Sequence, residues 1–302
     1  MEKGEWRTEK LPELCVAHVI SLTSPRVACR LSAVSTTFRA AATSDTVWDC
    51  FLPSDWQSLV SRAVHPVEFS SFSSKRDIFF HLCDPILIDD GKMSFSVDRS
   101  SGAKCYILSA RELSITWADA PWYWRWRCLP ESRFAEVAEL TSVCWLEIRG
   151  KIESRMLSRK TAYAAYLIYD TANYAFGLNH PSQEASVKVG VHSSTKLVCL
   201  QPTDMLSRRH AQRASALCYR KEAEEVDGDS KEAEEVDESA EEVEEVDGAP
   251  QARNDDWMEL ELGEFYIDEG DDGEVKIRLL EVKGGHWKRG LIIEGIEIRP
   301  KQ

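Results

Sequence analysis

Apolar side chains recur at helical spacing through the N-terminal part of the chain. One apolar stripe is formed by Leu14, Cys15, His18, Val19 and Leu22. Ser24-Pro25 predicts an N-cap followed by proline at the first helical position, where the missing N–H costs nothing. Ser35 or Thr36 could cap the start of a third helix, and Ser44-Asp45 could start a fourth. Pro53 ends this series of helices. Residues 8–57 are therefore predicted to be a small all-α unit, too small to be robust without a partner.

Residues 58–103 have a mixed pattern. Ser70–Ser74 is loop-like, whereas Arg76–Leu82 is compatible with a short helix before the turn at Gly91. We expect this stretch to be a connector that packs on the part of the chain that follows.

From Lys104 onward the spacing of apolar residues changes from helical toward one in every two positions. Apolar residues alternate with charged ones at Met258, Leu260 and Leu262, at Val275, Ile277 and Leu279, and at Ile296 and Ile298. Half-buried antiparallel strands need this alternation, with one face on a core and one in water. Turn signals separate these segments at Asp272-Gly273, Gly284-Gly285, Gly290 and Gly295. The pattern predicts an antiparallel β-sandwich over residues 104–302.

An acidic repeat of period ten interrupts the predicted strands. Residues 221–248 read KEAEEVDGDS, KEAEEVDESA and EEVEEVDG, with fifteen Asp and Glu against two Lys. With only four valines as larger apolar residues, the segment cannot bury enough surface to offset its ordering entropy. We expect residues 219–254 to be a disordered insertion, either a passive spacer or an acidic docking segment.

The charge distribution narrows the function classes. The net charge of the chain is −14, of which the repeat supplies −13, so the remaining chain is almost neutral. A nearly neutral globule lacks the basic field that attracts nucleic acid. The polar N-terminus and the lack of a long apolar run predict no membrane segment. Nine widely spaced cysteines without a metal-ligand pattern predict buried, reduced thiols, no metal site, and the cytoplasm and nucleus as the compartments.

Residues 114–127, SITWADAPWYWRWR, hold four of the ten tryptophans. Pro121 breaks any regular ladder, so Trp117 ends one strand and a new segment follows. Trp122, Trp124 and Trp126 then share one face of that segment. Periodicity leaves two interpretations of this face, a hydrophobic core or a surface that binds a ligand.

Two segments resemble known families. LPELCVAHVISLTSPRVACRLSAVSTTFRAAATSDTVWDCFLPSDW (Leu11–Trp56) resembles an F-box, through its opening Leu-Pro, its Ser-Pro, its Val-Ser-x-x-Phe and its later Trp. Residues 104–300 are similar to a Nictaba-type lectin domain, the family of the plant phloem lectins. The similar blocks are ARELSITWADAPWYWRW, EVAELTSVCWLEIRGKIESRML, WMELELGEF, DGEVKIRLLEV and WKRGLIIEGIEIRP. The resemblance implies an α+β chain of two domains, F-box helices followed by a jelly-roll-like β-sandwich lectin.

The F-box resemblance implies docking on a Skp-type adaptor and, through it, on a cullin. The apolar positions expected at or under the adaptor surface are Leu11, Pro12, Val19, Ile20, Leu31, Val34 and Trp48. The alternative is that half of these residues form the hydrophobic core of the helical unit itself. Periodicity does not separate core residues from adaptor contacts.

The lectin resemblance implies a carbohydrate site. Trp117 and Trp124 match the tryptophans on which sugar binding depends in that family, and Glu274 and Glu281 match carboxylates at that site. We expect both indoles to stand open to solvent, whereas Trp122 and Trp126 are expected to be structural, and Trp145 and Trp287 match core positions. Glu274 and Glu281 are seven residues apart, so on a regular strand they point to opposite faces, which argues against a glycosidase pair.

Together these features predict a non-catalytic substrate-recognition subunit of a cullin-type ubiquitin ligase, without cofactor or metal. Its clients would be glycoproteins or oligosaccharides that contain N-acetylglucosamine or mannose. In one alternative the β-sandwich is a protein-interaction module without carbohydrate binding. In another, the chain is a free-standing lectin with a vestigial F-box.

Overall fold

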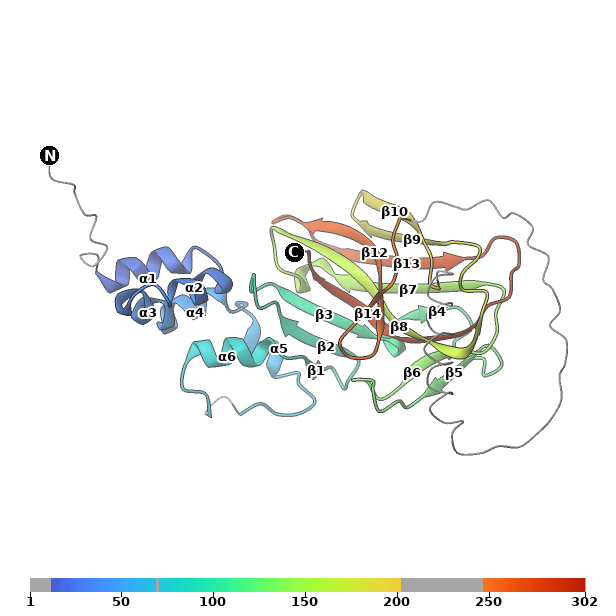
Figure 1. The fold of residues 1–302 in the computed structure, drawn as a ribbon, viewed down its shortest axis with the longest axis horizontal. Coiled ribbons are helices and arrows are strands. Elements are labelled where there is room, and N and C mark those ends of the chain that lie inside the picture. The colour runs from blue at the N-terminus through green and yellow to red at the C-terminus, as the bar shows by residue number, and fades with distance from the viewer. Residues whose placement is uncertain (1–11, 69–70, 202–246, 302) are drawn as a thin grey trace, which may run out of the picture.

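The structure is a computed structural model that describes residues 12–68, 71–201 and 247–301. Helices gather at one end of the molecule and strands form the rest (Figure 1). The prediction of N-terminal helices followed by antiparallel sheets is confirmed at this level. Leu11 and residues 219–246 of the predicted insertion lie outside the described residues.

Four short helices form the N-terminal unit: α1 (Glu13–Ser21), α2 (Pro25–Leu31), α3 (Thr36–Thr43) and α4 (Asp45–Phe51). The predicted helix starts are present, and Ser24 and Ser35 cap theirs through the side chain, whereas Ser44 at the start of α4 makes no side-chain cap bond. The Ser24 hydroxyl accepts from the Val27 N–H, with Pro25 as the first helical residue, and the Ser35 hydroxyl accepts from the Phe38 N–H. Trp48 on α4 is buried, and its indole N–H donates to the Ala42 carbonyl at 2.7 Å.

The segment that follows links these helices to the sheets. It contains α5 (Trp56–Val60), α6 (Lys75–Leu82), β1 (Ile86–Ile88) and β2 (Met93–Val97). Phe79 on α6 packs 5.1 Å from Trp48, between ring centroids. Arg62 forms an ion pair with Asp89, in which Nε lies 2.7 Å from Oδ1. Strand β2 pairs with β3, so the segment extends the larger sheet.

The described strands form two antiparallel sheets. The larger sheet has the order β1-β2-β3-β14-β8-β12-β11, with β6 on β14 and β5 on β6. Its further strands are β3 (Lys104–Ser109), β5 (Trp124–Arg127), β6 (Val137–Leu140), β8 (Thr161–Phe176), β11 (Gln251–Ala252), β12 (Met258–Ile267) and β14 (Arg289–Pro300). The smaller sheet has the order β10-β9-β13-β7-β4. Its strands are β4 (Ser114–Ile115), β7 (Leu146–Glu153), β9 (Gln183–Val189), β10 (His192–Val198) and β13 (Glu274–Glu281).

One continuous cluster of buried apolar side chains runs through the helices and both sheets, from Val16 to Ile298. The three alternating runs predicted from the sequence are all strands, within β12, β13 and β14. Two predicted turn glycines are misplaced: Gly290 and Gly295 lie inside β14, at its two register shifts against β8. A Cβ on Gly295 would meet the Leu108 carbonyl oxygen at 2.1 Å, so the close approach of β3 requires glycine there.

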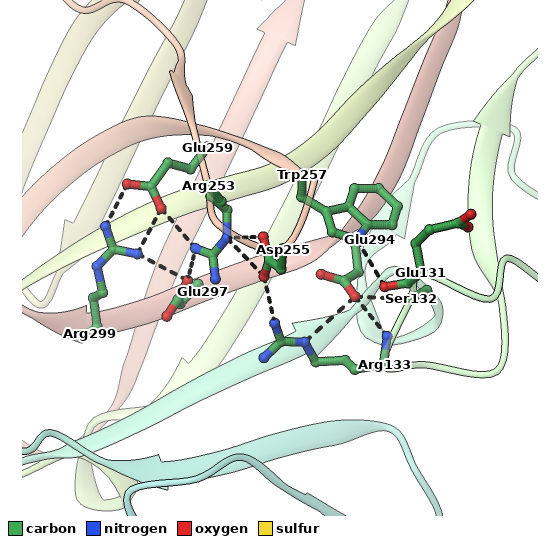
Figure 2. A network of polar contacts seen from close by, with 10 residues as sticks. All are labelled: Glu131, Ser132, Arg133, Arg253, Asp255, Trp257, Glu259, Glu294, Glu297 and Arg299. Atoms are coloured by element: carbon green, nitrogen blue, oxygen red, sulfur yellow. Dashed lines mark hydrogen bonds and ion pairs between the residues drawn. The ribbon is translucent and has the colours of Figure 1, made fainter.

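The two chain ends that flank residues 202–246 are both fixed beside β10. The Leu200 N–H donates to Gln183 Oε1, and the Asp247 N–H donates to the Leu197 carbonyl. Beyond Asp247, Arg253 inserts its guanidinium among the carboxylates of Asp255, Glu259 and Glu297 (Figure 2). The C-terminal boundary predicted for the disordered insertion, residue 254, is therefore wrong. Residues 247–254 are held by backbone pairing and by this ion network.

The prediction that the thiols are buried is wrong for most of the described cysteines, although none of these eight forms a disulfide. Among the eight described cysteines only Cys105 and Cys199 are buried, whereas Cys15, Cys29, Cys50 and Cys128 are exposed. Within the described residues, no three His, Cys, Asp or Glu side chains are placed to share a metal ion. None of the helices in that part of the chain has the length and hydrophobicity of a membrane span.

Candidate functional site

Trp117 lies in a turn directly after β4 and has an unusual backbone conformation. Its φ is +62°, a left-handed value that is uncommon for a bulky side chain. The turn is held by two backbone hydrogen bonds, from the Thr116 N–H to the Glu147 carbonyl and from the Ala120 N–H to the Trp117 carbonyl, each 3.0 Å long. The indole is 41% exposed and lies 5.0 Å from the Tyr123 ring, between centroids. A strained residue with an exposed aromatic ring is a typical feature of a ligand site.

Two tryptophans of β5 fix the residues on either side of Trp117. The Trp124 indole N–H donates to the Thr116 carbonyl and the Trp126 indole N–H to the Ala118 carbonyl, both at 3.1 Å. Trp124 is only 2% exposed, so the expectation that its ring stands open to solvent is wrong. The strand alternation turns Trp124 inward, where its N–H meets the turn. Trp124 is placed to position Trp117, and Trp126 supports the same turn.

Glu147 on β7 connects this turn to the smaller sheet. Its Oε1 accepts from Arg149 at 2.6 Å and from Arg278 at 2.5 Å. Its Oε2 has two longer contacts of 3.4 Å, from the Thr116 hydroxyl and the Trp145 indole N–H. Burial by itself would raise the Glu147 pKa, but these hydrogen bonds, chiefly from the two guanidinium groups, lower it to about 2. The carboxylate is therefore ionised at physiological pH. Its side chain is only 6% exposed, so a ligand hydroxyl that reached Oε2 would replace one of the two 3.4 Å contacts.

Trp145 and Glu147 are site residues that the sequence interpretation missed. Trp145 was expected in the core, but it is 43% exposed. A signal was present: Trp145, Glu147, Arg149 and Lys151 alternate with Leu146, Ile148, Gly150 and Ile152, which places the first set on the outward face. Trp287 and Trp122 are also exposed, against the expectation of core and structural positions.

The two predicted carboxylates lie far from each other. Glu274 and Glu281 occupy opposite ends of β13, and at ~3.3 Å per residue they are separated by roughly 23 Å. Glu281 is 3% exposed and forms an ion pair with Lys288, which is fully buried. Lys288 also donates to the Cys144 and His286 carbonyls, so Glu281 joins β13 to the chain segment before β14.

Glu274 belongs to a separate hollow. Its carboxylate accepts from Lys151 at 2.8 Å and borders a cavity of about 240 Å³ with Ser154 and Gly190. Because the Glu147 end of β7 pairs with the Glu281 end of β13, the structure does not bring Glu274 next to Trp117.

A groove of about 1010 Å³ borders the Trp117 turn. Asp119 and Pro121 of the turn line it together with Arg125, Glu139 and Tyr174. Arg111 lies over the Trp126 ring at 3.5 Å, and Arg127 pairs with Glu139 at 3.0 Å. The turn therefore carries an exposed indole close to the buried Glu147 carboxylate and also borders a groove rich in hydrogen-bonding groups. This arrangement suits a ligand with an apolar face and many hydroxyl groups.

The N-terminal helices carry a second candidate surface. On α1, Val16, Ala17 and Ile20 are buried, while Leu14 and Val19 are exposed together with Leu22 just beyond the helix. The apolar stripe predicted from the sequence therefore faces outward. An outward apolar stripe on a helix is typical of a protein-binding surface.

The predicted adaptor residues divide into two sets. Pro12, Val19 and Val34 are exposed, Leu31 is half-buried, and Ile20 and Trp48 are sealed in the core. Leu11 lies outside the described residues. Leu14 and Leu22, absent from the predicted adaptor set, are more exposed than Val19.

Comparison with known proteins identifies the family. The phloem protein 2 family model matches residues 103–300, from the start of β3 to the end of β14. The chain belongs to the phloem protein 2 family. It is 43% identical to the F-box protein PP2-B1 of Arabidopsis thaliana over 321 residues, which covers 98% of this chain and 90% of that protein. It is 42% identical to the F-box protein VBF of the same plant over 297 residues, which covers 96% and 99% of the two chains.

These relatives and the family model agree with the resemblance seen in the sequence. The chain is an F-box protein with a phloem protein 2 domain. A solved α-L-fucosidase from Vibrio sp. strain EJY3 covers 88% of this chain and 46% of its own, but with 9% identity and a TM-score of 0.25 it carries no argument about activity.

Proposed function

We propose that this member of the phloem protein 2 family is the substrate-recognition subunit of a cullin-type ubiquitin ligase and has no catalytic centre of its own. The proposal places it in the cytoplasm and nucleus. In this proposal the α1 side binds a Skp-type adaptor and, through it, a cullin. The domain of two sheets, a β-sandwich in this proposal, binds the client. The observation that carries it is the exposed apolar stripe of Leu14, Val19 and Leu22, in a chain whose relatives are named F-box proteins.

Adaptor binding is tested with a charge placed on that stripe. Val19→Asp should abolish co-purification of a Skp-type adaptor, because a carboxylate would be buried without a partner in the complex. Val191→Asp is the matched control, since Val191 is 91% exposed in the turn between β9 and β10. The proposal would be contradicted if the Val19 variant bound the adaptor as well as the parent and the Val191 variant do.

The client ligand in this proposal is a glycan that contains N-acetylglucosamine or mannose. The apolar face of a pyranose would stack on Trp117, and its hydroxyls would reach Glu147 Oε2 and the groove beyond Asp119. One such site would bind in the millimolar-to-micromolar range, about −4 to −8 kcal/mol. Trp117→Ala should abolish retention on an immobilised glycoprotein. Tyr266→Ala, which removes an exposed ring from β12, should not affect it.

A second candidate function is a protein-interaction module without carbohydrate binding. Trp124 and Glu281, two of the four residues predicted to contact sugar, are buried, which supports this alternative. Client capture from enzymatically deglycosylated extract distinguishes the two. Capture that persists after deglycosylation supports the protein module, whereas capture that disappears supports the glycan receptor.

A further inference from the structure

The outer face of the smaller sheet carries a group of basic side chains, of which only Arg149 and Arg278 also contact a residue of the proposed glycan site, Glu147. Arg149 and Lys151 come from β7, Lys276 and Arg278 from β13, and Lys188 from β9. All five are exposed and alternate with buried residues. They line one hollow of about 590 Å³, together with the hydroxyl-bearing Ser114, Ser186 and Ser193. We call this the cationic hollow.

Within the cationic hollow, like charges lie directly opposite one another. Lys276 pairs in register with Lys151 on one side and with Lys188 on the other, which makes a row of three lysines across three strands. In the next row Arg278 is opposite Arg149. Like charges at directly opposite positions destabilise a sheet. Such an arrangement is expected where an anionic ligand compensates the cost.

The carboxylates of the protein lie at the margins of this hollow. Glu147 accepts from both arginines at one end, and Glu274 at the other end lies 2.8 Å from Lys151 and 3.7 Å from Lys276. Glu153 and Glu184 are farther along the same face. Glu112 also borders the hollow but faces Lys92 at 4.0 Å. Lys188 forms no ion pair within the described residues, so the middle of the hollow remains cationic.

The acidic repeat of the same chain is attached next to this hollow. Residues 222–245 contain fourteen carboxylates. The two flanking ends, at Gln201 and Asp247, are both held beside β10, the edge strand that pairs with β9. From Leu197 the middle of the hollow lies two strand spacings, ~10 Å, across the sheet and four residues, ~13 Å, along it, so it is roughly 16 Å away. Ten residues of extended chain span ~33 Å. The tether gives the repeat an effective concentration on the order of millimolar at the hollow.

We propose that the acidic repeat, residues 221–246, binds the cationic hollow formed by β7, β9 and β13 of its own chain. The repeat would supply carboxylates to Lys188, which forms no ion pair in the described part of the chain. It would also supplement Glu147, which is shared by the two arginines, and Glu274, which is shared by Lys151 and Lys276. Binding is electrostatic and multivalent, without one fixed register, because the repeat offers equivalent carboxylates every ten residues. Any external polyanion that uses this face has to compete with the repeat. The inference does not rest on adaptor or glycan binding, although Arg149 and Arg278 of the hollow also hold Glu147 of the proposed glycan site.

The first test maps the contact in the full chain. Zero-length carbodiimide cross-linking joins a carboxylate to a lysine amine, and the monomeric product is digested and sequenced by mass spectrometry. The expected cross-links run from the repeat to Lys151, Lys188 and Lys276 and disappear in 0.5 M NaCl, where screening is strong. Cross-links at equal yield to the exposed Lys160 and Lys301, which do not line the hollow, would overturn the proposal, as would no cross-links from the repeat.

The second test measures competition with a fluorescein-labelled poly-L-glutamate of about twenty residues. In one variant every Glu and Asp of residues 222–245 is changed to Gln or Asn, which keeps the length. We expect this variant to bind the probe at least tenfold more tightly than the parent, equivalent to ~1.4 kcal/mol. Lys188→Ser and Lys276→Ser in that background should remove the gain, whereas Lys160→Ser and Lys301→Ser should retain it.

Either of two results would contradict intramolecular binding. Equal probe affinity of the parent and the amide variant would show that the repeat does not occupy the hollow. A gain that is lost equally with both lysine pairs would show only a general effect of net charge.

Discussion

The indole N–H of Trp124 donates to the carbonyl of Thr116 at 3.1 Å, and so holds the residue that precedes the exposed Trp117. A buried tryptophan thereby supports the position of an exposed one. Its contribution to a ligand site is indirect, through the left-handed turn at Trp117.

Removing this hydrogen bond should weaken ligand binding by more than the accompanying loss of folding stability would cause. Trp124→Phe keeps most of the apolar ring but leaves the Thr116 carbonyl without its donor, at a cost of about 1–2 kcal/mol. The matched control is Trp257→Phe, because Trp257 is also buried and its indole N–H also donates to a carbonyl, that of Glu131 at 3.3 Å (Figure 2).

Both variants should lose similar free energy of unfolding in urea. At a temperature where both are fully folded, only Trp124→Phe should bind glycan about tenfold more weakly. Equal glycan affinity of the two variants would show that Trp124 is purely structural.

The buried ion pair of Glu281 and Lys288 should be costly to break on one side. Lys288→Met leaves the Glu281 carboxylate buried without its cation and should lower the free energy of unfolding by about 3–5 kcal/mol. The double variant Glu281→Leu with Lys288→Met should recover most of that loss. Urea unfolding of the three proteins measures the coupling, with the exposed Lys276→Met as the control. A double variant as unstable as the single one would contradict this explanation.

The low pKa of Glu147 predicts a specific acid sensitivity. Its pKa is about 2 in the folded chain and about 4.5 in the unfolded one, so its stabilisation is complete above pH 4.5. As the pH falls from 4.5 toward 2, the unfolded state takes up the proton first and a contribution of ~3 kcal/mol is lost. Glu147→Gln should be less stable than the parent at pH 6, and the difference should shrink by pH 2.5. A difference that does not change with pH would argue against an ionised, arginine-paired carboxylate.

Trp48 should prove to be a core residue and not an adaptor contact. It packs against Phe51 and Phe79 and is 1% exposed. Trp48→Ala should lower the free energy of unfolding by about 3–5 kcal/mol, because it removes a large buried ring. Trp48→Phe should fold and retain the adaptor with unchanged affinity, in contrast to Val19→Asp. Loss of adaptor binding by a folded Trp48→Phe would place this ring in the interface.

The helices and several strands were predictable from local sequence alone. Ser24-Pro25 and Ser35 cap helices through their own neighbours, and the alternation in Met258–Leu262 directly reports one exposed face of β12. The exposure of Trp145 was also encoded in alternation, since it shares parity with Glu147. The family resemblance outweighed that local signal and was wrong at this residue.

The geometry of the site depended on contacts between distant segments. The left-handed φ of Trp117 is fixed by two indoles from β5 and by β7, which no spacing in residues 114–127 reveals. The lysine row likewise joins Lys151, Lys188 and Lys276 only through strand register. Register is determined by the whole sheet, so a single sequence does not provide it.

The continuous cluster from Val16 to Ile298 also has a mechanical consequence. A receptor whose halves share one interior cannot swivel between them, so in the proposed ligase the distance and direction from adaptor to client are constant. The client lysines that receive ubiquitin would then be those that lie at this constant distance and direction from the adaptor. Loosening the packing of α4 on α6, where Trp48 contacts Phe79, should therefore change which lysines are modified before it changes which clients are bound.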